Sequence, residues 1–372
     1  MPRPLRWLAW LTYSVLLTGI GTELIVRLLM PQVLPLDAPQ IYRPDDAIGW
    51  RRTANVRALA NTGDRDVLIC TDDQGDRISC MTPSPATCAQ RVLVVGDSFV
   101  EALAVPFEET AWARLEHDTG ACVEVAGVGG YEPGQYLQLV RERLRSDRLH
   151  YDLVIVSLFV GNDVVNDAER IPPAQAVWKQ PIRVLPEGLD ADALVRWLHP
   201  FDQWLESRSH AYVATRFAIR NARDPGDVGI YGLPVAVVRD RFTPAMVDAT
   251  CQAFALMADE ASRAGVPFLI TIVPARMQVL DPDGTRLKTV FPALASSIDM
   301  DLVSNSVAPR LATFDGVSGV VDLLPVLRSD PRPEYWGVRD QHFGPGGHAT
   351  WFAALRVPVR TALALPAWSS PQ

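Results

Sequence analysis

The feature that most constrains the fold is a set of short, continuous hydrophobic runs separated by helical patterns. Five such runs, rich in β-branched residues, lie at 91–96, 122–126, 152–158, 267–273 and 319–323. None has the alternation of a strand with one face in water, so each is expected to be a strand buried on both faces. Helical patterns lie at about 108–118, 133–147, 245–264, 300–312 and 345–357. The alternation predicts an α/β fold with a three-layer, doubly wound parallel sheet.

Polar residues and glycines follow several of these runs where the strands are expected to end. The first run ends in Gly96-Asp97-Ser98, the second is followed by Gly127-Val128-Gly129-Gly130, and the third by Gly161-Asn162-Asp163. Open parallel sheets bind ligands outside the carboxyl ends of their strands. Asp340-Gln341-His342 lies in a glycine-rich segment near the end of the chain. We expect the four segments to converge at one sheet edge.

Ser98 is the candidate nucleophile. A serine hydroxyl attacks an acyl group efficiently only when a base accepts its proton, and an imidazole oriented by a carboxylate does this. His342 is the expected base, and Asp340 is close enough in sequence to bind its other ring nitrogen. Two alternatives stay open: Asp340 caps a turn beside a surface His342, or His348 is the base. His348 is expected to pack inside the last helix.

These motifs resemble the SGNH (GDSL-type) family of hydrolases and acyltransferases. The resemblance covers roughly residues 90–165 and 265–357 and is carried by Gly96–Glu101, Gly161-Asn162-Asp163 and Asp340-Gln341-His342. It implies a flavodoxin-like SGNH fold and an oxyanion hole formed by the backbone N–H groups of Ser98 and Gly130 and the side chain of Asn162. The chain departs from the commonest family pattern in having one residue, not two, between the Asp and the His. It also has Val125-Ala126 where an Asn usually precedes the glycine turn.

The oxyanion donors have alternatives of their own. A residue without Cβ lets backbone approach the substrate closely, which favours a glycine in the turn after the second run. Gly127 or Gly129 could take this place instead of Gly130, or the turn could be an ordinary loop. Asn162 could form an Asx-turn rather than a donor site.

The neighbouring residues are expected to support the site. Gly96 and Gly161 shape the turns, and Asp97 and Asp163 are expected to tie the loops together. A pair of carboxylates could in principle cleave glycosides, but that mechanism leaves Ser98 and His342 without roles. Glu101 is expected to complement the dipole at a helix N-terminus.

The N-terminal segment differs from the rest of the chain. An apolar stretch from Leu5 to Met30 follows Arg3 and precedes a proline-containing linker. It reaches the roughly 20 residues needed to cross a bilayer, and its leading basic residues predict a cytoplasmic N-terminus. A retained anchor is favoured over a cleaved signal peptide, because no convincing cleavage site follows the stretch. Glu23 and Arg27 are spaced to pair on one helical face.

Three regions are predicted along the chain. Residues 1–35 form the membrane anchor or an uncleaved signal, 36–90 a linker with a short β-rich lead-in, and 91–365 the catalytic domain. An insertion at about 164–243 interrupts the strand–helix rhythm and is expected to shape the substrate pocket. Its tryptophans are expected to pack in a core, with stacking on sugar rings as the alternative; they are Trp178, Trp197 and Trp204.

The five cysteines fit an oxidising compartment. Cys70, Cys80 and Cys88 lie close together in a loop-like stretch, so two of them can pair. Cys122 and Cys251 are expected to be small buried hydrophobic residues. The spacings of the first three are not those of zinc motifs, so no metal site is expected.

Composition narrows the function further. The chain has 372 residues, a net charge of −8 and no basic run, which argues against a nucleic-acid partner. We expect a serine esterase or O-acetyltransferase that needs no cofactor and acts on small acyl esters, such as those of acylated cell-envelope carbohydrate. The expected place is the bacterial inner membrane, with a single span and the catalytic domain outside the cytoplasm. The alternatives are a lipid-directed esterase or lysophospholipase, and a non-catalytic scaffold for envelope polysaccharide assembly.

Overall fold

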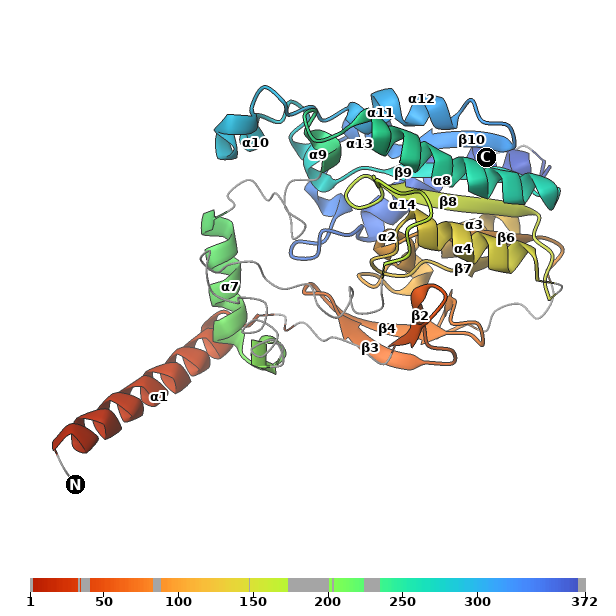
Figure 1. The fold of residues 1–372 in the computed structure, drawn as a ribbon. Helices are drawn as coiled ribbons and strands as arrows, with labels where there is room; N and C mark the ends of the chain where they lie inside the picture. Colours follow the sequence, from red (N-terminus) through yellow and green to blue (C-terminus); the bar gives the residue numbers. More distant parts are fainter. Residues whose placement is uncertain are drawn as a thin grey trace, which may run out of the picture.

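A single large sheet forms the centre of the protein (Figure 1). The computed structural model describes residues 3–32, 34, 41–82, 88–146, 148–172, 201–202, 204–223 and 235–366. The sheet has eight strands in the order β10-β9-β8-β6-β7-β5-β4-β3. Their bounds are β3 Arg57–Asn61, β4 Asp66–Thr71, β5 Arg77–Ile78, β6 Arg91–Val95, β7 Cys122–Val125, β8 Leu153–Phe159, β9 Phe268–Val273 and β10 Val317–Asp322.

The five strands predicted from the hydrophobic runs are parallel to one another, from β10 to β7. The predicted lead-in adds something that the hydrophobic pattern did not indicate. Its strands β5, β4 and β3 continue the same sheet in antiparallel fashion, with Arg77 of β5 paired to Val125 of β7. The sheet is therefore mixed and mostly parallel, and β7 is not an edge strand.

Helices cover both faces of the parallel part, which confirms the three-layer prediction (Figure 1). Alternate residues of β6 point to opposite sides. Val92 and Val94 join a core that includes Trp112 and Trp351, whereas Leu93 and Val95 join a core that includes Phe254. The first core is covered by α3 (Ala111–Thr119), α13 (Leu323–Ser329) and α14 (Pro345–Ala362), and the second by α4 (Pro133–Leu144), α8 (Pro244–Arg263), α11 (Leu302–Ser306) and α12 (Ala308–Leu311).

The helical pattern predicted at 300–312 is divided in two. Pro309 lies in the first turn of α12, where proline is tolerated, but it cannot continue a helix from the preceding residues. The remaining elements are short: β1 (Tyr42–Asp45), β2 (Gly49–Arg52), α2 (Ser98–Glu101), α9 (Arg276–Leu280), α10 (Thr285–Val290) and single 3₁₀ turns at Phe107–Glu109, Val235–Val237, Pro292–Leu294 and Pro333–Tyr335.

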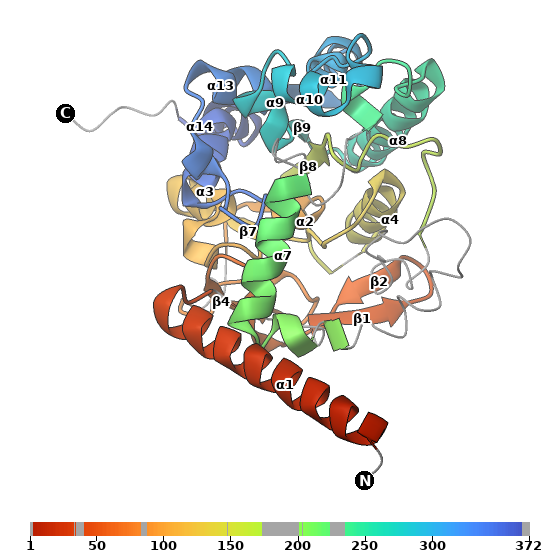
Figure 2. The ribbon, with the colours of Figure 1, turned by 90° about the vertical axis from the view of Figure 1, so that its left-hand side faces the viewer.

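The N-terminal helix α1 (Arg3–Leu29) projects from the body of the protein (Figures 1 and 2). Its segment Leu5–Leu29 is long and apolar enough to cross a membrane, a property that signal sequences share. Glu23 and Arg27 pair at 3.2 Å, as their spacing predicts. Helix α7 (His210–Arg223) lies against the C-terminal end of α1, on the side to which the carboxyl ends of the parallel strands point (Figure 2).

Contacts between α1 and α7 centre on Glu23. Its carboxylate accepts hydrogen bonds from the Ser209 hydroxyl at 2.7 Å and from the backbone N–H groups of His210 and Ala211 at 3.0 and 2.9 Å. These are donors that the start of a helix leaves without intrahelical partners. A side chain of α1 therefore caps α7.

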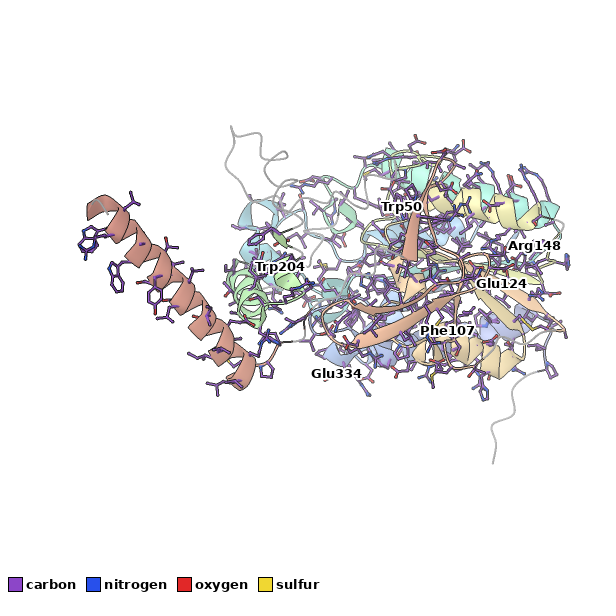
Figure 3. The ribbon with its side chains drawn as sticks, turned by 90° about the horizontal axis from the view of Figure 1, so that it is seen from below. Trp50, Phe107, Glu124, Arg148, Trp204 and Glu334 are labelled. Carbon is purple, nitrogen blue, oxygen red and sulfur yellow. A yellow bond between two sulfur atoms is a disulfide. The ribbon has the colours of Figure 1, made fainter. Side chains whose placement is uncertain are left out.

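Of the three insertion tryptophans, Trp178 and Trp197 lie outside the described residues. Trp204 is half exposed and stacks on Phe201, with ring centroids 6.0 Å apart. It lies at the end of the molecule nearest α1, opposite the end that carries Arg148 (Figure 3). The prediction that Trp204 packs in a core is therefore wrong, because half of its surface is exposed.

Two disulfides stabilise the region around β7. Cys70 pairs with Cys80, within the group in which a pair was expected. Cys88 pairs with Cys122, so the prediction that Cys122 is only a small buried hydrophobic residue is wrong. The two thiols meet because Cys88 precedes β6 and Cys122 begins the adjacent strand β7. Cys251 is buried and unpaired, as predicted.

Candidate active site

Ser98 begins the short helix α2 directly after β6. The side chain of Asp97 caps this helix by accepting a hydrogen bond from the backbone N–H of Phe99 at 2.9 Å. The turn needs a small residue before it, because a Cβ on Gly96 would lie 2.4 Å from Val100 Cγ2. Ser98 is partly exposed although its neighbours are buried. Its hydroxyl is thus presented at the carboxyl edge of the sheet, as predicted.

His342 and Asp340 meet Ser98 there. His342 Nε2 lies 2.7 Å from Ser98 Oγ, and His342 Nδ1 lies 2.5 Å from Asp340 Oδ1. Asp340 Oδ1 also accepts the backbone N–H of His342 at 3.0 Å, which makes the one-residue spacing between them a compact turn. With a proton on Nδ1, the free lone pair of Nε2 faces the serine hydroxyl. This arrangement can transfer a proton from the hydroxyl to the imidazole.

Charges around His342 favour its protonated form. Burial lowers the pKa of His342, but the neighbouring Asp340 carboxylate outweighs burial and holds this pKa above its ordinary value. For Asp340 the directions are reversed. Burial raises the pKa of this carboxyl group, but the charge and hydrogen bond of His342 outweigh burial and hold the pKa of Asp340 below its ordinary value. The imidazolium that forms during acyl transfer is therefore stabilised by a carboxylate that stays ionised.

The glycine turn after β7 lies next to α2. Gly129 donates its backbone N–H to Glu101 Oε2 at 2.8 Å, and a Cβ on Gly127 would lie 2.5 Å from Val100 Cβ. Gly130 has a φ of 75°, a left-handed conformation that glycine adopts without strain. Since the Gly129 amide is bound to Glu101, Gly130 is the better candidate for an oxyanion donor.

Glu101 does not have the role expected for it. It lies in the last position of α2, is fully buried, and also accepts a hydrogen bond from the Tyr42 hydroxyl at 2.7 Å. Burial raises the pKa of Glu101 above its ordinary value. The helix is only four residues long, so the carboxylate reaches across to the glycine turn instead of the helix N-terminus.

The loop after β8 brings Asn162 to the same edge. Asn162 Nδ2 lies 3.4 Å from the Tyr131 carbonyl oxygen, in the segment that follows the glycine turn. Asp163 is fully buried; it accepts hydrogen bonds from the Phe159 N–H at 2.6 Å and from the Tyr136 hydroxyl at 3.0 Å. Asp163 thus joins the end of β8 to α4, in line with the loop-tying role expected for it. A Cβ on Gly161 would lie 2.3 Å from Phe159 Cε1, so this turn requires a glycine unless the Phe159 ring moves.

Two buried carboxyl groups near the site share a cause for their altered acidity. Burial raises the pKa of Asp97 to about 6 and the pKa of Asp163 well above its ordinary value. Both side chains are engaged by backbone N–H groups of their own loops. These hydrogen bonds indicate that Asp97 and Asp163 stabilise their loops.

His348 is held away from the reaction site. It lies in α14, is 1% exposed, and stacks on Trp351 with ring centroids 5.9 Å apart. Burial lowers the pKa of His348 to about 3, so this ring stays neutral. The expectation that it packs inside the last helix is confirmed.

The lead-in segment contacts the site in ways that sequence reasoning missed. Trp50 donates its indole N–H to the Gly129 carbonyl at 3.1 Å, and Tyr131 donates its hydroxyl to the Trp50 carbonyl at 2.5 Å. Trp50 belongs to the β1–β2 hairpin and is buried (Figure 3). The Gly-Trp pair at 49–50 was the only signal in the sequence for this contact.

Within the described residues, no group of three or more His, Cys, Asp or Glu side chains is arranged to hold a metal ion.

Comparison with known proteins adds a family context. No protein-family model matches the chain, and no curated protein matches it. Solved structures similar to it include a GDSL-like lipase from Bacteroides thetaiotaomicron, at 14% identity over 76% of this chain and 94% of that one, with a TM-score of 0.37. A member of the lipolytic G-D-S-L family from Veillonella parvula has 9% identity over 72% and 97%, with a TM-score of 0.36. AlinE4, an SGNH-hydrolase family esterase, has 16% identity over 76% and 100%, with a TM-score of 0.29.

These structures belong to the family that the motifs resemble. Because the TM-scores lie below 0.5, we infer the function from the geometry at Ser98 and not from these structures.

Proposed function

We propose that this protein is an SGNH-type serine ester hydrolase or acyltransferase. The observation that carries the proposal is the contact of His342 Nε2 with Ser98 Oγ at 2.7 Å while Asp340 holds the opposite ring nitrogen at 2.5 Å. A serine, a base and an orienting carboxylate in this order are the machinery of acyl transfer.

In the proposed reaction, Ser98 Oγ attacks the ester carbonyl as His342 takes the hydroxyl proton. The backbone N–H groups of Ser98 and Gly130 and the Asn162 side chain would stabilise the negative charge that develops on the carbonyl oxygen. Collapse of the tetrahedral intermediate breaks the bond to the leaving alcohol, which receives the proton from His342. Water or an acceptor alcohol then attacks the acyl-serine, with His342 again as the base. The bond between the acyl carbon and Ser98 Oγ breaks as His342 returns the proton to Oγ, which releases the acid or the new ester.

The substrate class follows from the place we propose for the enzyme. We propose that α1 stays as a single-pass anchor of a bacterial inner membrane, with the catalytic domain outside the cytoplasm. The cap that Glu23 provides to α7 supports retention, because cleavage after α1 would remove it. The two disulfides support an oxidising compartment. Small acyl esters of envelope carbohydrate are the substrates that fit this place.

The test is a fluorophosphonate probe applied to the full chain in detergent, followed by turnover of a chain-length series of nitrophenyl esters with and without a sugar acceptor. Wild type should be labelled and Ser98→Ala should not. Ser262→Ala, an exposed serine on α8, is the matched control and should label like wild type. Best turnover of long chains would favour the lipid-directed esterase, and labelling that survives Ser98→Ala would refute the assignment. Absence of any labelling would favour the scaffold.

A further inference from the structure

The tip of the β3–β4 hairpin reaches the loop that carries Asp340. Asp64 lies at this tip, between β3 and β4, and each of its carboxylate oxygens accepts a different backbone N–H. Oδ1 binds the Arg339 amide at 2.9 Å and Oδ2 binds the Asp340 amide at 2.9 Å. A residue of the lead-in thus binds two successive backbone amides that lie 275 and 276 positions away in the sequence.

The contact between the Asp64 carboxylate and these two amides is close, and other hydrogen bonds within the hairpin support it. A Cβ placed on Gly337 would lie 2.2 Å from Asp64 Oδ2, so the loop passes directly over the carboxylate. Asn61 Oδ1 accepts the Gly63 N–H at 2.8 Å, and Asn61 Nδ2 donates to Asp66 Oδ1 at 2.7 Å. These contacts within the hairpin hold the tip that carries Asp64.

The loop that Asp64 binds has little regular structure of its own. Residues 337–342 form bends and turns between a 3₁₀ turn and α14. A backbone shift at Asp340 moves the carboxylate that orients His342, and misplacement by about 1 Å can reduce a rate about 100-fold. Charge-assisted bonds from one carboxylate to two amides are stronger than neutral ones and fix direction as well as distance.

We propose that Asp64 is a positioning residue for the Asp340–His342 pair, so that the hairpin of residues 57–71 is a working part of the active site. The expected effect on reaction rate rests on the proposed function. The expected effect on the position of Asp340 and His342 rests on the contacts alone. An asparagine at position 64 keeps one acceptor but presents an N–H group to the second amide. The substitution Asp64→Asn therefore removes one of the two hydrogen bonds without changing the size of the side chain.

The matched control is Asp73→Asn. Asp73 is an exposed carboxylate just after the hairpin, where it pairs with Arg148 at 2.6 Å and has no contact with the loop of Asp340 among the described residues. It tests whether the same change of charge and side chain elsewhere in the lead-in has the same effect. In the full chain in detergent, we expect Asp64→Asn to slow fluorophosphonate labelling at least tenfold and to lower the midpoint of its pH profile. Asp73→Asn should stay within twofold of wild type, with an unchanged midpoint.

A second readout does not depend on activity. Besides Asp340, the charged side chains that raise the pKa of His342 are Asp97 and Glu101, which neither variant changes. NMR titration of the His342 ring in the resting protein should show a lower pKa in Asp64→Asn than in wild type and in Asp73→Asn. If wild type does not react with the probe, the proposed function fails, and this titration alone decides the inference. Equal His342 titration in all three proteins, or equal loss of rate in both variants, would overturn it.

Discussion

Glu101 binds Gly129 across the space between the nucleophile helix and the glycine turn. The carboxylate accepts the Gly129 N–H at 2.8 Å and is held on its other side by the Tyr42 hydroxyl at 2.7 Å. One buried side chain thus connects α2, which begins with Ser98, to the turn that presents the Gly130 amide. The Glu101 side chain therefore helps to set the distance between the nucleophile and the proposed oxyanion donor.

Substitution of Glu101 should therefore lower the reaction rate more than it lowers the stability of the fold. Loss of one oxyanion donor typically lowers kcat about 10²–10³-fold. We expect Glu101→Ala to lower kcat for nitrophenyl acetate by about 10–100-fold, because the donor is displaced but not removed. Glu101→Gln keeps an acceptor for Gly129 and should recover most of the rate. An alanine variant with full kcat and an unchanged thermal midpoint would contradict the bridge.

The pH dependence of the reaction should follow His342. The base must be neutral to accept the serine proton, and its pKa lies above the ordinary value of 6.5. We expect kcat/KM to rise with pH through a midpoint above that value. Asp340→Asn should move the midpoint downward and lower kcat by about 10²–10⁴-fold, since the ring loses its orienting partner. A pH-rate profile identical in wild type and Asp340→Asn would argue against the assignment of Asp340.

The same pair should affect stability in a defined pH range. Because the folded pKa of His342 is raised, its contribution is fully present below the unfolded value of about 6.5 and is lost as pH rises through the folded value. We expect wild type to exceed His342→Ala in free energy of unfolding by more at pH 5 than at pH 9, by on the order of 1 kcal/mol. Urea denaturation at both pH values measures this. A larger difference at pH 9 would refute it.

The bond between Cys88 and Cys122 should contribute to stability and not to chemistry. It closes a loop across 34 positions of sequence. A cross-link of this kind stabilises by about 2–4 kcal/mol. The double variant Cys88→Ser/Cys122→Ser should show this loss in denaturant and keep its kcat at low temperature. Reductant should lower the denaturation midpoint of wild type more than that of the double variant.

Removal of the cap on α7 should loosen that helix selectively. Glu23→Ala leaves the His210 and Ala211 amides of α7 without their side-chain acceptor, and loss of an N-cap costs about 1 kcal/mol. We expect faster proteolytic cleavage within residues 201–223 and unchanged labelling of Ser98. Glu23→Gln retains an acceptor oxygen and should be cleaved more slowly than Glu23→Ala. Cleavage at the same rate in all three proteins would contradict the cap.

The strands were predictable from the sequence because their signal is local. Each is a run of apolar residues that needs burial on both faces, and β6, β8 and β9 begin or end within one or two residues of the prediction. The short helices α9, α10 and α13 were not predicted, since five to seven residues span fewer than two helical turns and show no repeated hydrophobic pattern. Pro309 could have indicated the break between α11 and α12.

Motifs allowed the meeting point of the candidate residues to be predicted, whereas contacts with distant partners could not be predicted. The structure brings Ser98, His342 and Asp340 together at the edge where their motifs predicted convergence. Glu101 and Asp64 gave no such signal, because their partners lie 28 and 275 positions away and are backbone amides of any residue type. Nothing in the letters of a sequence marks an amide that a remote carboxylate will bind.

The antiparallel strands β3 to β5 also determine where a shortened protein can begin. A fragment starting at Arg91 would expose the edge of β7, which is a template for association with other chains. It would also lose the partner of Cys122 and both Tyr42 and Trp50. A fragment for crystallisation or screening should therefore start no later than Ile41, and one trimmed to the parallel strands should aggregate.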